Sequence, residues 1–224
     1  MPSDLQITNI KDQANANSAI TIASDGQVTI SQNNPTLTLG SNATFPTGHV
    51  LQVLQYYKTD RDTISGSASS SDGTNANNFA FIPGQGSDAV FQQSITTTGS
   101  NKVLITHNGN YGSSAATYLL MFQLFRGAAV DTVVGSCTKL GAGGDVGNTQ
   151  QTECNSSLYT ASASGMVTTS FSYLDSPGAG THYYKLGWLG QSGANYYIGR
   201  TGNDTNAAYI ASTASALTVM EIKA

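Results

Sequence analysis

The two acidic residues closest together in the chain are Asp60 and Asp62, which flank Arg61. Alternate residues of a β-strand face the same side, so the two carboxylates could act as the general acid and base of a glycosidase. Such an enzyme holds its pair roughly 5 to 10 Å apart. An Asp-Arg-Asp sequence at the end of a strand is more often a solvated turn. We therefore expect a turn here rather than a catalytic pair.

The three histidines, His49, His107 and His182, have no Cys, Asp or Glu at the spacing of metal ligands. We expect them to be surface or hydrogen-bonded residues. The alternative is that one histidine from each of three chains meets the others on a symmetry axis and holds an ion.

The two cysteines, Cys137 and Cys154, lie near the ends of a long glycine-rich loop, 135–157. Lys139 is the basic residue near them, which is too little to favour an activated thiolate. A disulfide across the loop is possible and would stabilise the fold by about 3 kcal/mol.

Sequence motifs of common enzymes are absent. The chain has no Gly-x-x-x-x-Gly-Lys phosphate loop, no His-Glu-x-x-His and no Gly-x-Ser-x-Gly. The glycines of segment 141–147 have the wrong spacing for a dinucleotide-binding fingerprint. We predict no catalytic residue, no cofactor and no metal, and thus no enzyme.

Aromatic residues gather in the last third of the chain, and amphipathic rings serve both glycan sites and protein interfaces. We expect two neighbouring strands to carry them, with half of the rings in the core and the others on a subunit interface or, as the alternative, a glycan-binding face. These residues are Tyr183, Tyr184, Trp188, Tyr196 and Tyr197.

The composition excludes several classes of protein. Only 10% of the 224 residues are charged, against roughly 25% in an average domain, and the polar positions are mostly Ser, Thr, Asn, Gln and Gly. Such residues favour strands and turns over helices. A formal net charge of −4 without a basic run argues against nucleic-acid binding. No apolar run approaches the ~20 residues of a membrane span, and the first residues lack a signal-peptide pattern.

The first 46 residues are predicted to form a separate N-terminal β stem or attachment arm. Short strands with two aliphatic residues each repeat at 19–22, 27–30 and 36–39. Strands this short bury too little apolar area to offset the entropy lost on ordering, so they need a partner. A threefold stem of three chains would supply one, and a flexible linker is the alternative. The aliphatic residues of the arm are Leu5, Ile7, Ile10, Ile20, Ile22, Val28, Ile30, Leu37 and Leu39.

Residues 47–224 are predicted to form the head domain. About eight longer strands alternate with turn sequences, and 118–126 is apolar on both faces, as in a central strand. The sequence His107–Asn110 resembles a hairpin turn. The fold class expected is all-β: an antiparallel, jelly-roll-like sandwich preceded by the short-stranded arm, and trimeric.

The chain resembles small virion structural proteins of tailed bacteriophages of aquatic bacteria. At the N-terminus the resemblance rests on 5–11, 18–26 and 28–30, and at the C-terminus on 171–175, 185–188 and 217–222. It covers both ends and most of the chain. It implies a head similar to trimeric tumour-necrosis-factor-like jelly rolls, and a protein made in the host cytoplasm and exposed on the particle exterior.

Two virion roles are expected from this resemblance. The favoured role is a capsid cement or decoration homotrimer that clamps neighbouring subunits of the major capsid protein. The alternative is a tail-fibre receptor-binding protein that attaches to tail proteins and presents loops 65–78 and 135–157 to a host surface glycan. A carbohydrate-binding module outside a virion is a remote third alternative. None of these roles involves nucleic acid or a membrane.

Overall fold

A computed structural model describes residues 9–11, 18–22, 28–30, 45–65, 79–115, 118–130, 134–141, 154–160, 162–163, 165–190, 194–203 and 212–224. The chain divides into two compact units, Met1–Thr44 and Phe45–Ala224. The described part of the first unit is one three-stranded antiparallel sheet of β1 (Asn9–Lys11), β2 (Ser18–Ile22) and β3 (Val28–Ile30).

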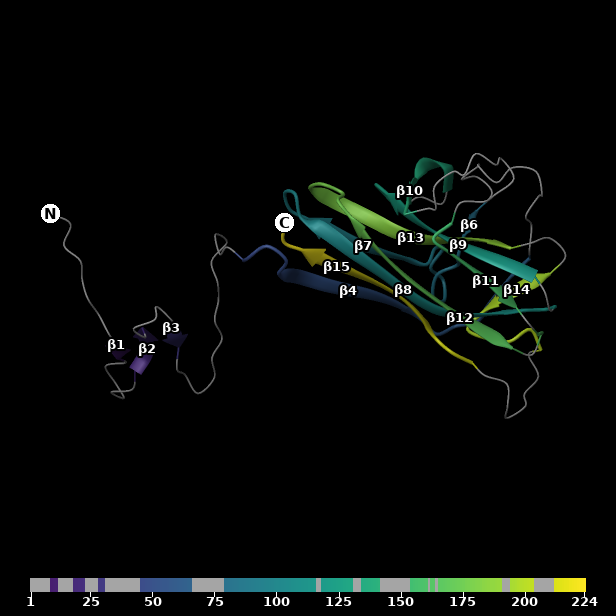
Figure 1. Ribbon diagram of the computed structural model, residues 1–224, viewed down its shortest axis with the longest axis horizontal. Coiled ribbons are helices and arrows are strands. Elements are labelled where there is room, and N and C mark those ends of the chain that lie inside the picture. The colour runs from purple at the N-terminus through teal and green to yellow at the C-terminus, as the bar shows by residue number, and fades with distance from the viewer. Residues whose placement is uncertain are drawn as a thin grey trace. The chain divides into compact units, whose positions relative to one another are not determined.

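The second unit is a sandwich of two antiparallel sheets (Figure 1). The β9 sheet has the order β10-β9-β13-β6, with β11 also pairing with β9 and β7 with β13. Its strands are β6 (Ala80–Phe81), β7 (Gln92–Thr97), β9 (Tyr118–Gly127), β10 (Thr138–Leu140), β11 (Ser156–Thr160) and β13 (Gly180–Gly190).

The β8 sheet has the order β4-β15-β8-β14-β5, with β12 pairing with β8. Its strands are β4 (Val50–Lys58), β5 (Asp62–Ser65), β8 (Lys102–Ser113), β12 (Met166–Asp175), β14 (Asn195–Ile198) and β15 (Ser215–Ile222). The helical element in the described part of the chain is one 3-10 turn, Val134–Ser136. The expected all-β antiparallel sandwich is confirmed.

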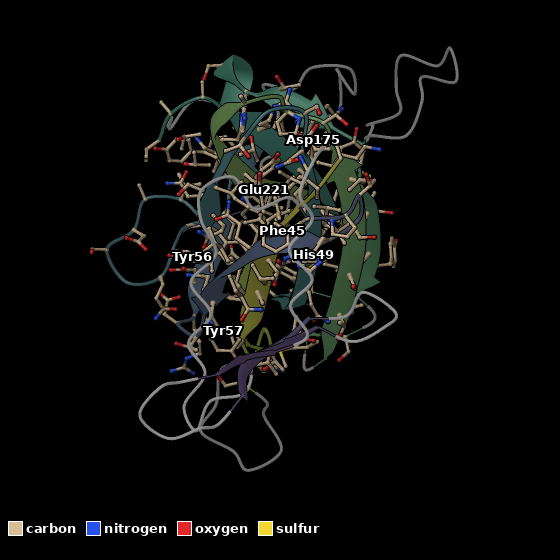
Figure 2. The ribbon with its side chains drawn as sticks, turned by 90° about the vertical axis from the view of Figure 1, so that its left-hand side faces the viewer. Phe45, His49, Tyr56, Tyr57, Asp175 and Glu221 are labelled. Carbon is tan, nitrogen blue, oxygen red and sulfur yellow. The ribbon has the colours of Figure 1, made fainter. Side chains whose placement is uncertain are left out.

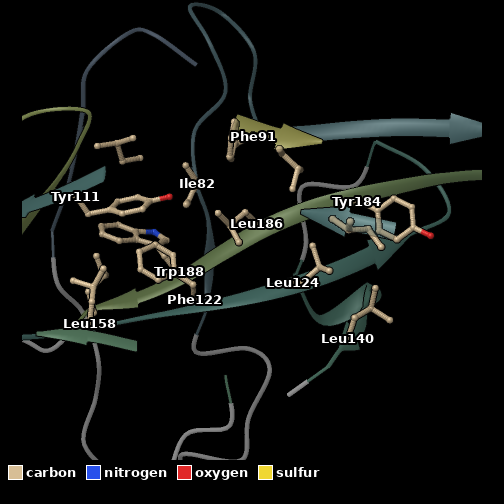
Figure 3. Packing of buried hydrophobic residues seen from close by; sticks show 14 of the residues in the cluster. Ile82, Phe91, Tyr111, Phe122, Leu124, Leu140, Leu158, Tyr184, Leu186 and Trp188 are labelled. Carbon is tan, nitrogen blue, oxygen red and sulfur yellow. The ribbon is translucent and has the colours of Figure 1, made fainter. Parts of the chain in front are cut away.

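The predicted central strand is also confirmed. β9 pairs with β13 on one edge and with β10 and β11 on the other. Leu120, Phe122 and Leu124 are fully buried in the main core between the sheets (Figure 3). Phe125 belongs to a second buried cluster with Phe79, Val134 and Leu189. Because both faces of β9 are covered, its sequence is apolar without alternation.

The predicted turn at His107–Asn110 is wrong, because β8 runs through it without a break and pairs with β12 from Val103 to Gly112. Gly109 is not needed for a left-handed backbone here. A Cβ at this position would lie 2.8 Å from both His107 Nε2 and the Tyr111 hydroxyl. The glycine therefore leaves room for the contact between these two side chains inside the sandwich.

Candidate functional site

The expected acidic pair, Asp60 and Asp62, follows the end of β4 and binds a buried lysine. Lys58 is 1% exposed, and its ammonium contacts both carboxylates and donates to the Gly84 carbonyl at 2.7 Å. Burial alone would raise the pKa of Asp60, but hydrogen bonds from Lys58 and the Gly86 N–H hold it below its usual value. A lowered pKa leaves Asp60 without a proton to donate at neutral pH, which does not suit a general acid.

The pair lies in the short connection between β4 and β5, as expected of a turn, with the two side chains 29% and 31% exposed, but a neighbouring loop also holds it. Loop 84–88 packs against it, and the Gln85 side-chain oxygen accepts from the backbone N–H groups of Thr59 and Asp60 at 2.6 and 3.1 Å. The Tyr56 hydroxyl donates to Asp88 at 2.6 Å, and burial followed by this carboxylate raises the pKa of Tyr56 to about 12. Sequence reasoning missed Lys58, although its position two and four residues before the aspartates was the available signal.

His107 is a buried core residue. Its Nδ1 lies 3.0 Å from the Ala216 carbonyl, which can only accept, so Nδ1 carries the proton and Nε2 accepts from the Tyr111 hydroxyl at 2.9 Å. The rings of Phe91, Phe122 and Phe171 surround it at centroid distances of 5.4 to 6.3 Å. Burial lowers the pKa of His107 to about 4, so the ring is neutral at pH 7.

The other two histidines lie at the surface or near it. His49 is exposed and stacks on Phe45 with ring centroids 4.8 Å apart (both labelled in Figure 2). His182 Nε2 is 3.2 Å from the Gly178 carbonyl oxygen. These placements confirm the expectation of surface or hydrogen-bonded histidines. Among the described residues, no three His, Cys, Asp or Glu side chains form a group that could hold a metal.

Two buried carboxylates, each at the end of a strand, accept hydrogen bonds from other parts of the sandwich. Asp175 Oδ2 accepts from Arg126 Nη1 at 2.6 Å and from the Tyr184 hydroxyl at 2.9 Å. Burial and then the charge of Asp175 raise the pKa of Tyr184. These groups hold one another in place between the two sheets.

Glu221 is the second buried carboxylate. It accepts from Gln52 Nε2 and Asn101 Nδ2, both at 2.7 Å, and from the Thr98 N–H at 3.1 Å. Burial opposes ionisation of Glu221, but the bonds from Asn101, Gln52 and Thr98 hold its pKa below the usual value. The carboxylate thus fixes the 98–101 turn to β15 and has a structural role.

The five aromatic residues of the last third were expected on two neighbouring strands, and this part of the prediction is wrong. β13 and β14 belong to opposite sheets, and Trp188 and Tyr196 meet edge to face across the core at 5.7 Å. Tyr184 and Tyr196 are 0% exposed, and Trp188 is 3% exposed. Tyr197 is also buried, with Arg200 over its ring at 4.3 Å, and Tyr183 is half-buried. As expected of about half of the rings, Tyr184, Trp188 and Tyr196 lie in the core, where they are not available to a glycan or a subunit.

Cys137 and Cys154 are both thiols in this structure rather than a disulfide. Both are half-buried and pack against the second cluster around Phe125. Burial raises the pKa of the Cys154 thiol, with Lys139 opposing the shift. A raised pKa disfavours the thiolate, so the expected lack of a nucleophilic cysteine is consistent with this environment.

The N-terminal unit aligns its aliphatic positions across three strands. Ile10 pairs with Ile20, Ile20 pairs with Ile30, and Ile22 pairs with Val28. Directly paired residues of an antiparallel sheet share a face, so these five positions lie on one face. The paired positions Thr21 and Thr29 lie on the other face. Leu5, Ile7, Leu37 and Leu39 of the expected arm lie outside the described residues.

No family model and no curated protein matches the chain. Among solved structures it is similar to infectious bursal disease virus of the Gx strain, at 11% identity and a TM-score of 0.37, over 85% of this chain and 42% of that one. The structure of the Gt strain matches at 12% identity and a TM-score of 0.25, over 92% of this chain and 47% of that one. The VP2 subviral particle of the same virus matches at 10% identity and a TM-score of 0.23, over 84% of this chain and 46% of that one.

The chain spans less than half the length of these three viral chains. At these TM-scores the likeness supports no argument about function, and the sandwich is established by the strand pairing itself. No helix in the described part of the chain is long and apolar enough to cross a membrane.

Proposed function

We propose that this chain is a non-enzymatic structural protein on the exterior of a tailed-phage virion. In this proposal it decorates the capsid: the N-terminal strands bind the major capsid protein, and the sandwich is displayed outward. The observation that carries the proposal is the aligned aliphatic face of the three-stranded N-terminal sheet.

The strands of this sheet have three, five and three residues. A two- or three-stranded sheet of this length is marginal in water unless its apolar face packs against another surface. The aliphatic face defined by Ile10, Ile20, Ile22, Val28 and Ile30 is therefore suited to attachment, as the resemblance to virion proteins implies.

The head domain supports the same role. Its buried ionisable groups, Lys58, His107, Asp175 and Glu221, are each engaged by fixed partners that join strands and turns. A rigid, weakly charged sandwich of this kind suits a protein that covers a particle and need not change shape.

The glycan-binding alternatives receive less support. Trp188, the only tryptophan, is buried in the core and is not a stacking platform for a sugar. Most of loops 65–78 and 135–157 lies outside the described residues, so the tail-fibre role has no structural argument of its own.

The first experiment locates the protein on purified particles by immunogold labelling or by cryo-EM difference maps. Regular labelling over the head supports capsid decoration. Labelling confined to the tail contradicts it and favours the fibre, while an absence from particles contradicts both.

A matched pair of variants then tests the attachment face. Ile20→Asp places a charge on the aliphatic face of the middle strand, and Thr21→Asp places the same charge on the opposite face. We expect Ile20→Asp to reduce binding to capsids at least 100-fold and Thr21→Asp to change it less than threefold. Equal effects of the two substitutions would contradict attachment through this face.

A further inference from the structure

The outward face of the β8 sheet carries an apolar row that crosses four strands. Val53 of β4 is paired with Met220 of β15, Met220 with Leu104 of β8, and Leu104 with Leu174 of β12. Their neighbours in the same strands, Ile105 and Val219, are fully buried, so these four residues lie on the side away from the core. We call this set the outer row.

The outer row is exposed at its two ends, half-buried at Leu104 and Met220, and extended by further apolar residues on the same face. Val53 is 55% exposed and Leu174 is 48% exposed. Val50, paired with Ile222, and Tyr57, paired with Ala216, are exposed at 46% and 58%. An antiparallel sheet of a sandwich normally turns a polar face to water, so an apolar row of this width points to a contact.

The rest of this face is polar but almost without charge. Next to the outer row comes a row of Gln55, Thr218, Thr106 and Ser172, in which Gln55 Nε2 donates to the Thr218 hydroxyl at 2.8 Å. Lys102, at the rim, is the one charged residue among the outward positions of β4, β15, β8 and β12. The face therefore lacks the basic side chains that would bind a nucleic acid or another anionic surface.

An uncharged face suits a second copy of the same chain. Two copies with a net charge of −4 repel each other wherever acidic groups meet, and this face avoids that repulsion. Four strands about 4.8 Å apart and roughly eight residues long give a face of about 500 Å². Two such faces together reach the roughly 1,000 Å² that a specific interface requires.

The chain also leaves the sandwich at this end of the face. The Gly48 N–H donates to the Lys223 carbonyl at 2.7 Å and the Lys223 N–H to the His49 carbonyl at 2.9 Å, directly beyond Val50 and Ile222. Figure 2 shows Phe45 and His49 at this end together with Glu221.

We infer that the outer row is a self-association surface, on which the β8 sheet of a second copy of this chain packs. The contact is independent of the proposed place on a virion, because it is a property of the purified chain.

The test compares two sites at which one cysteine is introduced into the whole chain. Val53→Cys lies in the outer row, and Tyr159→Cys lies on β11 of the other sheet, where Tyr159 is 57% exposed, slightly more than Val53 at 55%. Both variants are pulse-labelled with a maleimide at 100 µM, and peptide mass spectrometry separates the new cysteines from Cys137 and Cys154. Light scattering measures the mass under the same conditions.

We expect a mass of more than one chain and labelling at position 53 at least tenfold slower than at position 159. Dilution until the mass is that of one chain should make the two rates equal. A mass of one chain at 100 µM overturns the inference, and so does equal labelling in an oligomer, which places the contact elsewhere. Protection of position 53 that persists in single chains also overturns it, because the chain's own segment then covers the face.

Discussion

Acid should weaken the sandwich through His107, a neutral ring with hydrogen bonds at both nitrogens in the aromatic core. Its pKa is about 4 in the folded chain, against 6.5 for an unperturbed histidine. Between these values the unfolded chain takes up a proton that the folded chain does not. Falling pH therefore favours unfolding, from about 6.5 down to about 4, and the effect levels off below that.

The magnitude follows from the two pKa values. The full gap of about 2.5 pH units, at 1.36 kcal/mol per unit, corresponds to about 3 kcal/mol. A little over half of this, roughly 2 kcal/mol, is lost between pH 7 and pH 5. Asp60 and Glu221 act in the same direction but at lower pH: their folded pKa values are depressed, so their stabilisation is lost only as pH falls below the values of 3.8 and 4.5.

The assay is urea denaturation between pH 7.5 and 4, with the free energy of unfolding plotted against pH. The control is His107→Gln, which keeps hydrogen-bonding capacity but does not titrate. This variant should be less stable at pH 7 and should have a flat profile between pH 7 and pH 5. A wild-type protein that loses less than about 0.5 kcal/mol over this range, or a variant with the wild-type slope, would refute the reasoning.

Three further substitutions, the first with a matched control, test the contacts and packing of the head. Lys58→Met leaves two carboxylates without their cation and should cost about 3 kcal/mol in urea denaturation, whereas Lys102→Met at the exposed rim should cost less than about 0.5 kcal/mol. Phe122→Ala empties a fully buried position between the sheets and should lower the free energy of unfolding by about 4 kcal/mol. Gly112→Ala places a Cβ 2.4 Å from the Arg200 carbonyl oxygen and should cost at least about 2 kcal/mol, seen as a lower Tm.

Local patterns in the sequence predicted the central strand but not every short one. The apolar residues on both faces of 118–126 correspond to β9, whereas β10 lies inside the segment 135–157 that was expected to be a loop, and β11 begins in it. The prediction failed at His107–Asn110, where the residue types of a turn occur inside β8. At this place the glycine does not bend the chain but leaves space for the hydrogen bond between His107 and Tyr111. This use of Gly109 depends on how the core packs, so the local sequence does not show it.

Pairing between strands was beyond local patterns. β13 and β14 follow each other in the chain, so they were expected side by side, but they lie in opposite sheets and their rings meet across the core. The outer row was missed for the same reason, since Val53, Leu104, Leu174 and Met220 are far apart in sequence. The available signal was that each strand is apolar on both faces at one end.

The sequence by itself determined the all-β class, because alternation with a period of two and turn residues are properties of each short segment. It also determined the aliphatic positions of the N-terminal strands. The tertiary structure alone decided which side chains are buried and which form a surface, because that depends on which strands become neighbours. In the folded chain Trp188 and Tyr196 are buried in the core, and Asp60 and Asp62 form ion pairs with Lys58. The same strand pairing places four residues that are distant in sequence side by side in the outer row.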